Sequence, residues 1–252
     1  MYNKGLFDDW VPKPVMLLLI ITFLFPILAV SGVFTNNLSD ISGSLAAYTE
    51  HIQMANNAVT VGMALAMPIL MRVKMRFRTK EIMVISTLAI AALLGLCATT
   101  DNVFFFIAGN LLIGFFKMFP LLEIIIPVMF MLSPKGDKGR FYSIFYPIAI
   151  GSSNLIGYAL TISAFDYGIT NIYYVNIIAM LVLAALALIF MHNKRFGFKM
   201  PLYQIDWVSL IFMCISMMTL NYGLSFLKQQ NWFNEPSIQW SFIIAFVSLG
   251  YV

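Results

Sequence analysis

The chain has few charged residues. Asp, Glu, Lys and Arg make up 10% of its 252 residues, whereas hydrophobic residues make up 61%. A water-soluble domain carries about 25% charged and roughly 45–50% apolar residues. These charges are too few to cover a soluble globule of this length, so lipid must solvate most of the surface. The composition therefore predicts an integral membrane protein.

Cysteine and histidine are also scarce. Cys97 and Cys214 both fall inside hydrophobic runs, where a lone thiol is a small apolar side chain and predicts neither a disulfide nor a metal site. His51 and His192 have no partner at a spacing that would bind a metal. No nucleophile with a nearby base is visible in the sequence. We therefore expect neither an enzyme nor a bound cofactor.

The hydrophobic runs are long and continuous. A helix needs about 20 apolar residues to cross the hydrocarbon layer, whereas a membrane β-barrel would alternate apolar and polar residues over roughly ten-residue strands. The runs do not alternate, so they predict an all-α, polytopic membrane helical bundle that crosses the bilayer at least seven times. The expected helices cover residues 13–34, 55–73, 81–99, 103–132, 141–164, 171–191 and 206–227, and an eighth begins near 237.

The basic residues lie on one side of this arrangement. All but Lys117 and Lys228 of the fifteen Lys and Arg fall in the N-terminal segment or in the loops around 72–80, 135–140 and 194–199. Lys and Arg are retained on the cytoplasmic side during insertion. We expect a multi-pass protein of the cell's inner (plasma) membrane with a cytoplasmic N-terminus. The net charge of +4 comes from these short loops, so it does not predict a nucleic-acid partner.

Two ionisable residues, Lys117 and Glu123, fall inside the run 103–132. Such residues cost about 2.5–3.5 kcal/mol each at mid-span on insertion scales. Six residues turn them about 120° apart on a helix, so we expect each to have its own surroundings. Asn110 lies seven residues before Lys117 on the same face, with Gly114 close to it. This polar stripe predicts a face that looks into a central cavity.

Each polar residue has two readings. Lys117 is a cation that favours an anionic or zwitterionic substrate, or a packing residue that snorkels or pairs with a neighbouring helix. Glu123 is a site that takes up a proton, or a residue near the interface that reaches Lys135 or Arg140. Asn154, in the run 141–164, is a substrate-binding residue or an amide that holds helices together.

The layout resembles a known family. Six helices, basic loops after the second, fourth and sixth, and a hairpin marked by Asp206-Trp207 and Asn231-Trp232 resemble the N-terminal portion of the fourteen-helix drug:proton antiporter branch of the major facilitator superfamily. The resemblance implies an N-terminal six-helix bundle at 1–200 and linker helices seven and eight at 201–252. Because the eighth run reaches the last residue, we expect the chain to be a fragment whose partner is the C-terminal bundle of the same protein.

The resemblance also implies a function. Members of the branch are secondary active transporters whose two bundles rock about a mid-membrane site. The expected activity is proton-coupled efflux of small amphipathic compounds, with a small-molecule substrate, protons and the lipid bilayer as partners. The candidate substrate or ion-binding residues are Lys117, Glu123, Asn110 and Asn154.

The family motifs are only partly kept. In the loop after the second helix, Arg76 matches the family's arginine and Arg78 replaces a glycine. Both are candidate residues of a cytoplasmic gate. In the fourth helix Asn110 stands where the family has an arginine and Gly114 is kept, and in the fifth helix only Gly157 of the antiporter motif survives.

Two alternatives follow from these departures. The first helix, residues 13–34, contains no acidic residue although the branch usually has one there. Together with Lys117, this favours an importer of an organic anion. The eroded loop motifs favour a degenerate carrier that no longer transports and serves as a membrane scaffold.

Overall fold

The chain folds as a bundle of α-helices. The computed structural model describes residues 6–8, 10–36, 38–132, 139, 142–143, 145–147, 150–151, 154–155, 158–159, 168–193, 195, 201, 203 and 205–252. Within these residues there is no β-strand, which confirms the predicted all-α membrane bundle. The helices are α1 (Lys13–Asn36), α2 (Leu38–Ser44), α3 (Thr49–Arg76), α4 (Thr79–Thr99), α5 (Val103–Leu132), α7 (Ile169–Phe190), α8 (Trp207–Phe226) and α9 (Pro236–Tyr251), with a 3₁₀ turn, η2 (Trp232–Asn234).

Five of the described helices are long and apolar enough to cross a membrane, namely α3, α4, α5, α7 and α8. Helix α1 contributes a shorter apolar stretch, Pro14–Val30, and α9 has 16 residues. The protein is therefore embedded in a membrane. The count of at least seven crossings, and the boundary between regions 1–200 and 201–252, stay predictions.

Most helix boundaries agree with the sequence pattern. The limits of α5 match the expected 103–132, and α1, α4, α7 and α8 agree within two residues. The described residues of the expected helix 141–164 are helical, and its other residues lie outside the described part.

Helix α3 differs most from its prediction, because it extends beyond the expected 55–73 at both ends. Its first two turns carry the polar residues Glu50, His51 and Asn56, and hydropathy alone does not show that such residues are helical. The short helix α2 was not predicted either.

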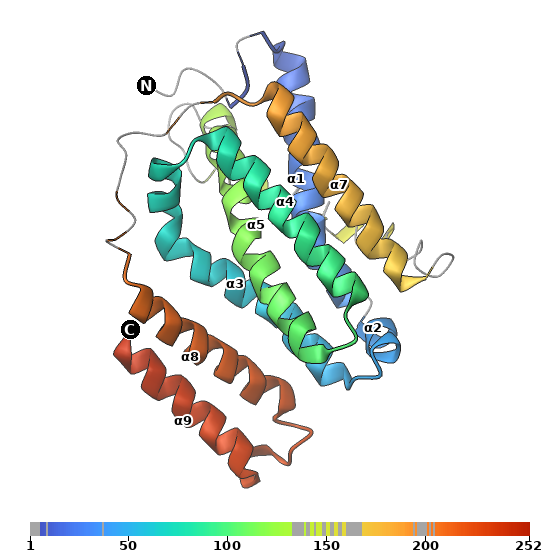
Figure 1. Cartoon of the computed structure of the whole chain (residues 1–252), viewed down its shortest axis with the longest axis vertical. Helices are drawn as coiled ribbons and strands as arrows, with labels where there is room; N and C mark the ends of the chain where they lie inside the picture. The colour runs from blue at the N-terminus through green and yellow to red at the C-terminus, as the bar shows by residue number, and fades with distance from the viewer. Residues whose placement is uncertain are drawn as a thin grey trace.

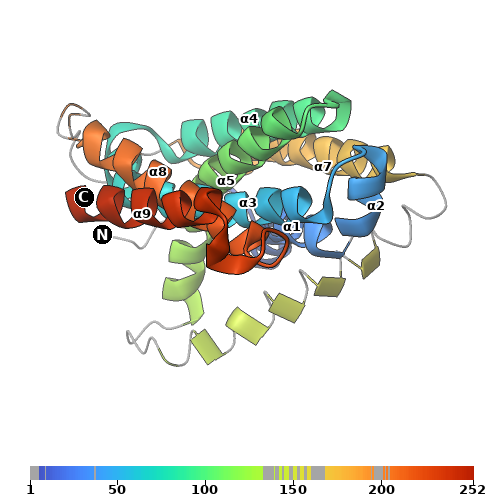
Figure 2. The ribbon, with the colours of Figure 1, turned by 90° about the horizontal axis from the view of Figure 1, so that it is seen from below.

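The helices pack in a defined order. Helix α3 packs on α5, α5 on α4, and α4 on α7, while α1 lies against α5 and α7. Figure 1 shows α3, α5, α4 and α7 running side by side, and Figure 2 shows the bundle from below, with α5 between α4 and α3. The side chains that fill the space between them are almost completely buried and include Phe23, Ile52, Met83, Phe106 and Ile124. Helix α5 therefore lies at the centre of the described bundle.

Two glycines bring the backbones of α3 and α5 into contact. A Cβ atom added to Gly62 of α3 would lie 1.9 Å from the carbonyl oxygen of Leu111 in α5. A Cβ atom added to Gly114 of α5 would lie 1.9 Å from the carbonyl oxygen of Val59 in α3. Small residues permit this close approach of membrane helices. Both positions of this crossing therefore require glycine.

Helices α8 and α9 form a hairpin beside α3 (Figure 1). The Asn221 amide of α8 donates to the Met54 carbonyl of α3 at 2.9 Å, and the Asn57 amide donates to Asn221 Oδ1 at 3.1 Å. Within the hairpin, the Ser216 hydroxyl donates to the Ala245 carbonyl at 2.8 Å. Neutral hydrogen bonds therefore connect the hairpin to the bundle.

One end of the bundle gathers the basic loops. The N–H of Asp8 donates to the Phe190 carbonyl at 3.0 Å, so the segment before α1 meets the end of α7. The Asp8 carboxylate also contacts the His192 ring. At the turn between α3 and α4, Arg78 forms a backbone bridge with Arg195. The N-terminal segment and these two basic loops therefore share one end of the bundle; which side of the membrane this end faces stays a prediction.

Candidate functional site: buried charges on helix α5

Lys117 is a buried lysine at the contact between α5 and α1. Its side chain is 2% exposed, and its Nζ donates to the carbonyl oxygen of Leu28 at 3.3 Å. Among the described residues, no carboxylate lies within 4.0 Å of this ammonium group. A carbonyl dipole is a weaker partner for an ammonium than a carboxylate is, since it carries only partial charge. When Lys117 is protonated, its ammonium group therefore has no full negative charge beside it among the described residues.

Glu123 has a charged partner on a different helix. Its Oε2 lies 3.2 Å from Nζ of Lys74, and the two side chains are 4% and 7% exposed. The pair joins the last turns of α3 to the second half of α5 and lies near the end of the bundle that carries Arg78. A buried ion pair of this kind depends on both charges, because removing one leaves the other buried and uncompensated.

Lys74 corrects the sequence interpretation, which placed this residue in the loop after the second helix and counted only two intramembrane charges. Helix α3 continues to Arg76, and Lys74 lies inside it, 6% exposed. The apolar run ends near Arg72, so hydropathy alone suggests that the helix stops there. The carboxylate of Glu123 offsets the cost of burying Lys74 and allows the helix to continue.

Asn110 lies at the other end of the polar stripe and contacts α4. It is fully buried, and its amide donates to the Phe106 carbonyl at 2.8 Å and approaches the Cys97 sulfur at 4.0 Å. Its Oδ1 has no hydrogen-bond partner among the described residues. A buried acceptor without a donor costs free energy, so Oδ1 is a position where a polar ligand or water molecule would be stabilised.

The polar groups of α5 face different helices. Asn110 contacts α4, Gly114 contacts α3, Lys117 contacts α1 and Glu123 contacts α3. The expectation that Lys117 and Glu123 have separate surroundings is therefore confirmed. All of these groups lie inside the described bundle, and a central cavity next to them stays a prediction.

The other candidate residues lie elsewhere. Asn154 is helical and exposed, and the described residues around it lie apart from α4, α5 and α7 in Figure 2. Arg76 is the last residue of α3 and is half-buried. Arg78 is exposed; its backbone N–H donates to Glu81 Oε2 at 3.0 Å, and its Nε lies 3.9 Å from Glu81 Oε1. The two arginines thus flank the turn that follows Lys74, at the end where a cytoplasmic gate was expected.

Some polar contacts could not be found from the sequence. The pairing of Asn57 with Asn221 joins residues 164 positions apart, and Lys74 pairs with Glu123 across 49 positions. Neither pair has a spacing that marks it. On α7, Asn176 is buried and its amide donates to the Ile172 carbonyl at 2.8 Å, so this hydrogen bond lies within the same helix. Among the described residues, no three His, Cys, Asp or Glu side chains come close enough to hold a metal ion.

Comparison of the chain with models of known protein families and with curated proteins found no match. The family resemblance in the sequence therefore stays a prediction. Any function assigned to the protein must be argued from the buried charges of α5 and the helices that they contact.

Proposed function

We propose that this chain is part of a secondary active transporter, of the drug:proton antiporter type, in the plasma membrane with its N-terminus in the cytoplasm. The observation that supports this proposal is the buried ion pair of Lys74 and Glu123, which joins α3 to α5. Ionisable residues inside membrane helices are expensive and usually serve ion or substrate pathways. Protonation of Glu123 would remove its attraction to Lys74. The pair can therefore couple proton binding to a movement of the two helices, as an antiporter requires.

The mechanism follows from two contacts between the same helices. The backbones touch at Gly62 and Gly114, and the ion pair lies twelve residues further along α3 and nine further along α5. At 1.5 Å per residue, these separations are about 18 Å and 14 Å. The glycine crossing can therefore act as a pivot and the ion pair as a fastening at one end. When Glu123 takes up a proton, the attraction to Lys74 is lost and this end of the two helices is released.

Release at that end fits alternating access. Arg76 and Arg78 lie at the turn that follows Lys74, so separating α3 from α5 moves this turn. Proton release from Glu123 restores the pair and closes the same end. In this proposal, the substrate is a small amphipathic compound, exported as protons enter.

Lys117 favours a second candidate, a carrier for organic anions. Its ammonium group is buried and contacts a carbonyl oxygen rather than a carboxylate. An anionic substrate group that reached Lys117 would supply the full negative charge that the Leu28 carbonyl does not. This candidate differs from the drug antiporter in its substrates, because a carrier for organic anions would not transport compounds without a negative charge.

Transport in everted membrane vesicles tests both candidates, using the protein that carries this chain. A pH-gradient dye is followed while cationic and anionic amphiphiles are added. Glu123→Gln is expected to abolish substrate-driven proton movement, and Glu235→Gln, at an exposed position, is the matched control and should retain it. Lys117→Ala should abolish transport of anions selectively, with exposed Lys228→Ala as its control.

The outcomes separate the proposals. If cationic compounds move protons and Glu123→Gln stops them, drug efflux is supported. If only anions move and Lys117→Ala stops them, the anion carrier is supported. If no compound moves protons and both variants behave as wild type, proton-coupled drug efflux is excluded, and the anion carrier or the membrane scaffold is favoured.

A further inference from the structure

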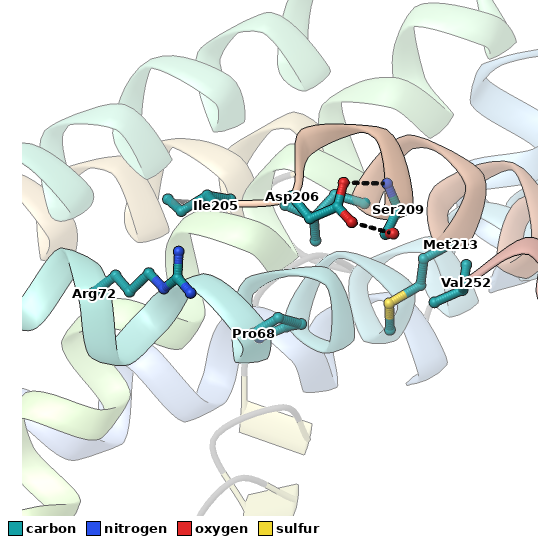
Figure 3. A pocket seen from close by; sticks show the side chains of 8 residues that line it. Pro68, Arg72, Ile205, Asp206, Ser209, Met213 and Val252 are labelled. Atoms are coloured by element: carbon teal, nitrogen blue, oxygen red, sulfur yellow. Dashed lines mark hydrogen bonds between the residues drawn. The ribbon is translucent and has the colours of Figure 1, made fainter. Parts of the chain in front are cut away.

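A cavity of about 250 Å³ lies between α3 and the start of α8. Figure 3 shows Arg72 and Pro68 extending from α3 on one wall, and Asp206, Ser209 and Met213 on the other. Pro68, Leu210 and Met213 make one part of the lining apolar, while Arg72, Asp206 and Ser209 make another part polar. The cavity is therefore amphipathic, and its lining does not include the buried charged residues of α5.

The two charged residues of this cavity do not pair with each other. Among the described residues, Nη1 of Arg72 is buried without a hydrogen-bond partner. The Asp206 carboxylate accepts from the N–H of Ser209 at 3.0 Å and from its hydroxyl at 2.7 Å. These two hydrogen bonds hold the pKa of the Asp206 carboxyl below its usual range, so it is ionised at neutral pH. One cavity thus presents a cation and an anion as separate binding groups.

The residues beside the cavity indicate that it lies at the level of the lipid headgroups. Asp206 directly precedes Trp207, the first residue of α8, whose side chain is 55% exposed, and indoles prefer the headgroup layer. Arg72 lies four residues before the end of α3, close to the turn that contains Arg78. The apolar lining residues continue from there into the membrane-spanning parts of α3 and α8. A ligand that fits would carry a polar head at this level and an apolar chain below it.

We propose that this cavity binds a zwitterionic phospholipid whose headgroup carries a primary amine, such as phosphatidylethanolamine. The phosphate accepts hydrogen bonds from Arg72, because a guanidinium matches phosphate geometry. The ammonium group donates to Asp206, and the first methylene groups of the chains lie against Pro68, Leu210 and Met213. An anionic headgroup is repelled by Asp206, and a choline headgroup has no N–H to donate.

Lipid binding to the purified protein that carries this chain, in detergent, tests this proposal by native mass spectrometry. Phosphatidylethanolamine, phosphatidylcholine and phosphatidylglycerol with identical acyl chains are compared. We expect roughly tenfold tighter retention of phosphatidylethanolamine, the difference that one charge-assisted hydrogen bond of about 1.4 kcal/mol provides. Equal retention of the three lipids would overturn the proposal. Binding of free phosphoethanolamine as tight as that of the lipid would also overturn it, since the apolar lining would then contribute nothing.

Two variants test the roles of the charges. Asp206→Asn retains a side chain that caps helices well, removes the negative charge, and should shift the preference from phosphatidylethanolamine to phosphatidylglycerol. Arg72→Gln should weaken binding of all phospholipids by roughly tenfold. Lys80→Gln, which changes a basic residue outside the cavity, is the matched control and should leave the preference unchanged. If Asp206→Asn retains the wild-type lipid preference while its helix content is intact, the assignment of Asp206 is wrong.

Discussion

The α3–α5 contact and the α8–α9 hairpin are joined by different chemistry. Glycine backbones and a buried ion pair connect α3 to α5. The hairpin is held by hydroxyls, small residues and neutral amides, such as Ser216 with the Ala245 carbonyl. Hydrogen bonds between neutral groups do not change between pH 5 and 8, whereas an ion pair depends on protonation. The comparison indicates that the bundle contains the contact that can switch, and that the hairpin is a fixed attachment.

The first expected effect concerns the glycine crossing and is comparable to that of breaking the ion pair. Gly114→Ala places a Cβ atom 1.9 Å from the Val59 carbonyl oxygen, so the two backbones must separate. The expected loss of stability is at or above the upper end of the roughly 1–3 kcal/mol typical of overpacking. It is measured as the thermal unfolding midpoint in detergent.

Gly250→Ala is the control for this prediction. No atom lies within 4 Å of a Cβ built at Gly250 of α9, and alanine is the better helix former by about 1 kcal/mol. The control should therefore keep or raise the midpoint. An unchanged midpoint in Gly114→Ala would show that α3 and α5 tolerate separation and are not in obligatory contact.

The second effect concerns the ion pair. Lys74→Met leaves Glu123 buried without its cation, and breaking a buried pair in this way costs about 3–5 kcal/mol. The double variant Lys74→Met/Glu123→Met replaces both charges with apolar side chains and should recover most of that loss. Unfolding midpoints of the single and double variants form a double-mutant cycle. Additive losses would mean that the two residues do not interact and would remove the basis for a switch here.

The third effect is smaller and concerns the attachment of the hairpin. Asn221→Leu removes the hydrogen bond that Asn221 donates to the Met54 carbonyl and those that it accepts from Asn57 and Ser225. Interhelical hydrogen bonds in membranes contribute about 0.6 kcal/mol on average and up to about 1.7 kcal/mol, so a loss of roughly 1 kcal/mol is expected. The loss should be the same at pH 5 and pH 8. A loss that depends on pH would contradict the fixed attachment.

The smallest effect concerns the first turn of α8. Ser209 lowers the pKa of the Asp206 carboxyl, so ionised Asp206 stabilises the folded turn above the ordinary carboxyl pKa of about 3.9. This contribution is lost as the pH falls through the lowered pKa of the folded state. Asp206→Asn should remove the dependence while keeping a cap. The check is amide hydrogen-exchange protection in residues 209–211 at pH 3 and pH 7, and equal pH dependence in both proteins would contradict the assignment.

Sequence alone predicted the features that depend on local composition. The apolar runs gave the fold class and the limits of α5, and the isolated position of Lys117 within such a run predicted an intramembrane cation, which the structure buries in the bundle. Hydropathy measures whether a segment prefers lipid, and these features follow from that preference.

The features that depend on distant pairs could not be predicted. Hydropathy placed Lys74 in a loop, because a lysine is costly to bury. The carboxylate that offsets this cost belongs to Glu123 on another helix, so the local sequence does not reveal it. The glycine crossing needs Gly62 and Gly114 to lie at the same level of two helices. The sequence of one helix does not determine its position relative to the other along the membrane normal. The same holds for Arg72 and Asp206, whose shared cavity arises only when α8 lies beside α3.

The contact of Lys117 with Leu28 has a consequence for how the protein is made. Leu28 of α1 is synthesised 89 residues before Lys117, so the carbonyl that receives the ammonium group is made well before α5 emerges. Until the two helices meet, α5 exposes a lysine to hydrocarbon, at a cost of a few kcal/mol. That cost favours prompt packing of α5 against α1. The buried lysine thereby couples the stability of α5 in the bilayer to its contact with α1.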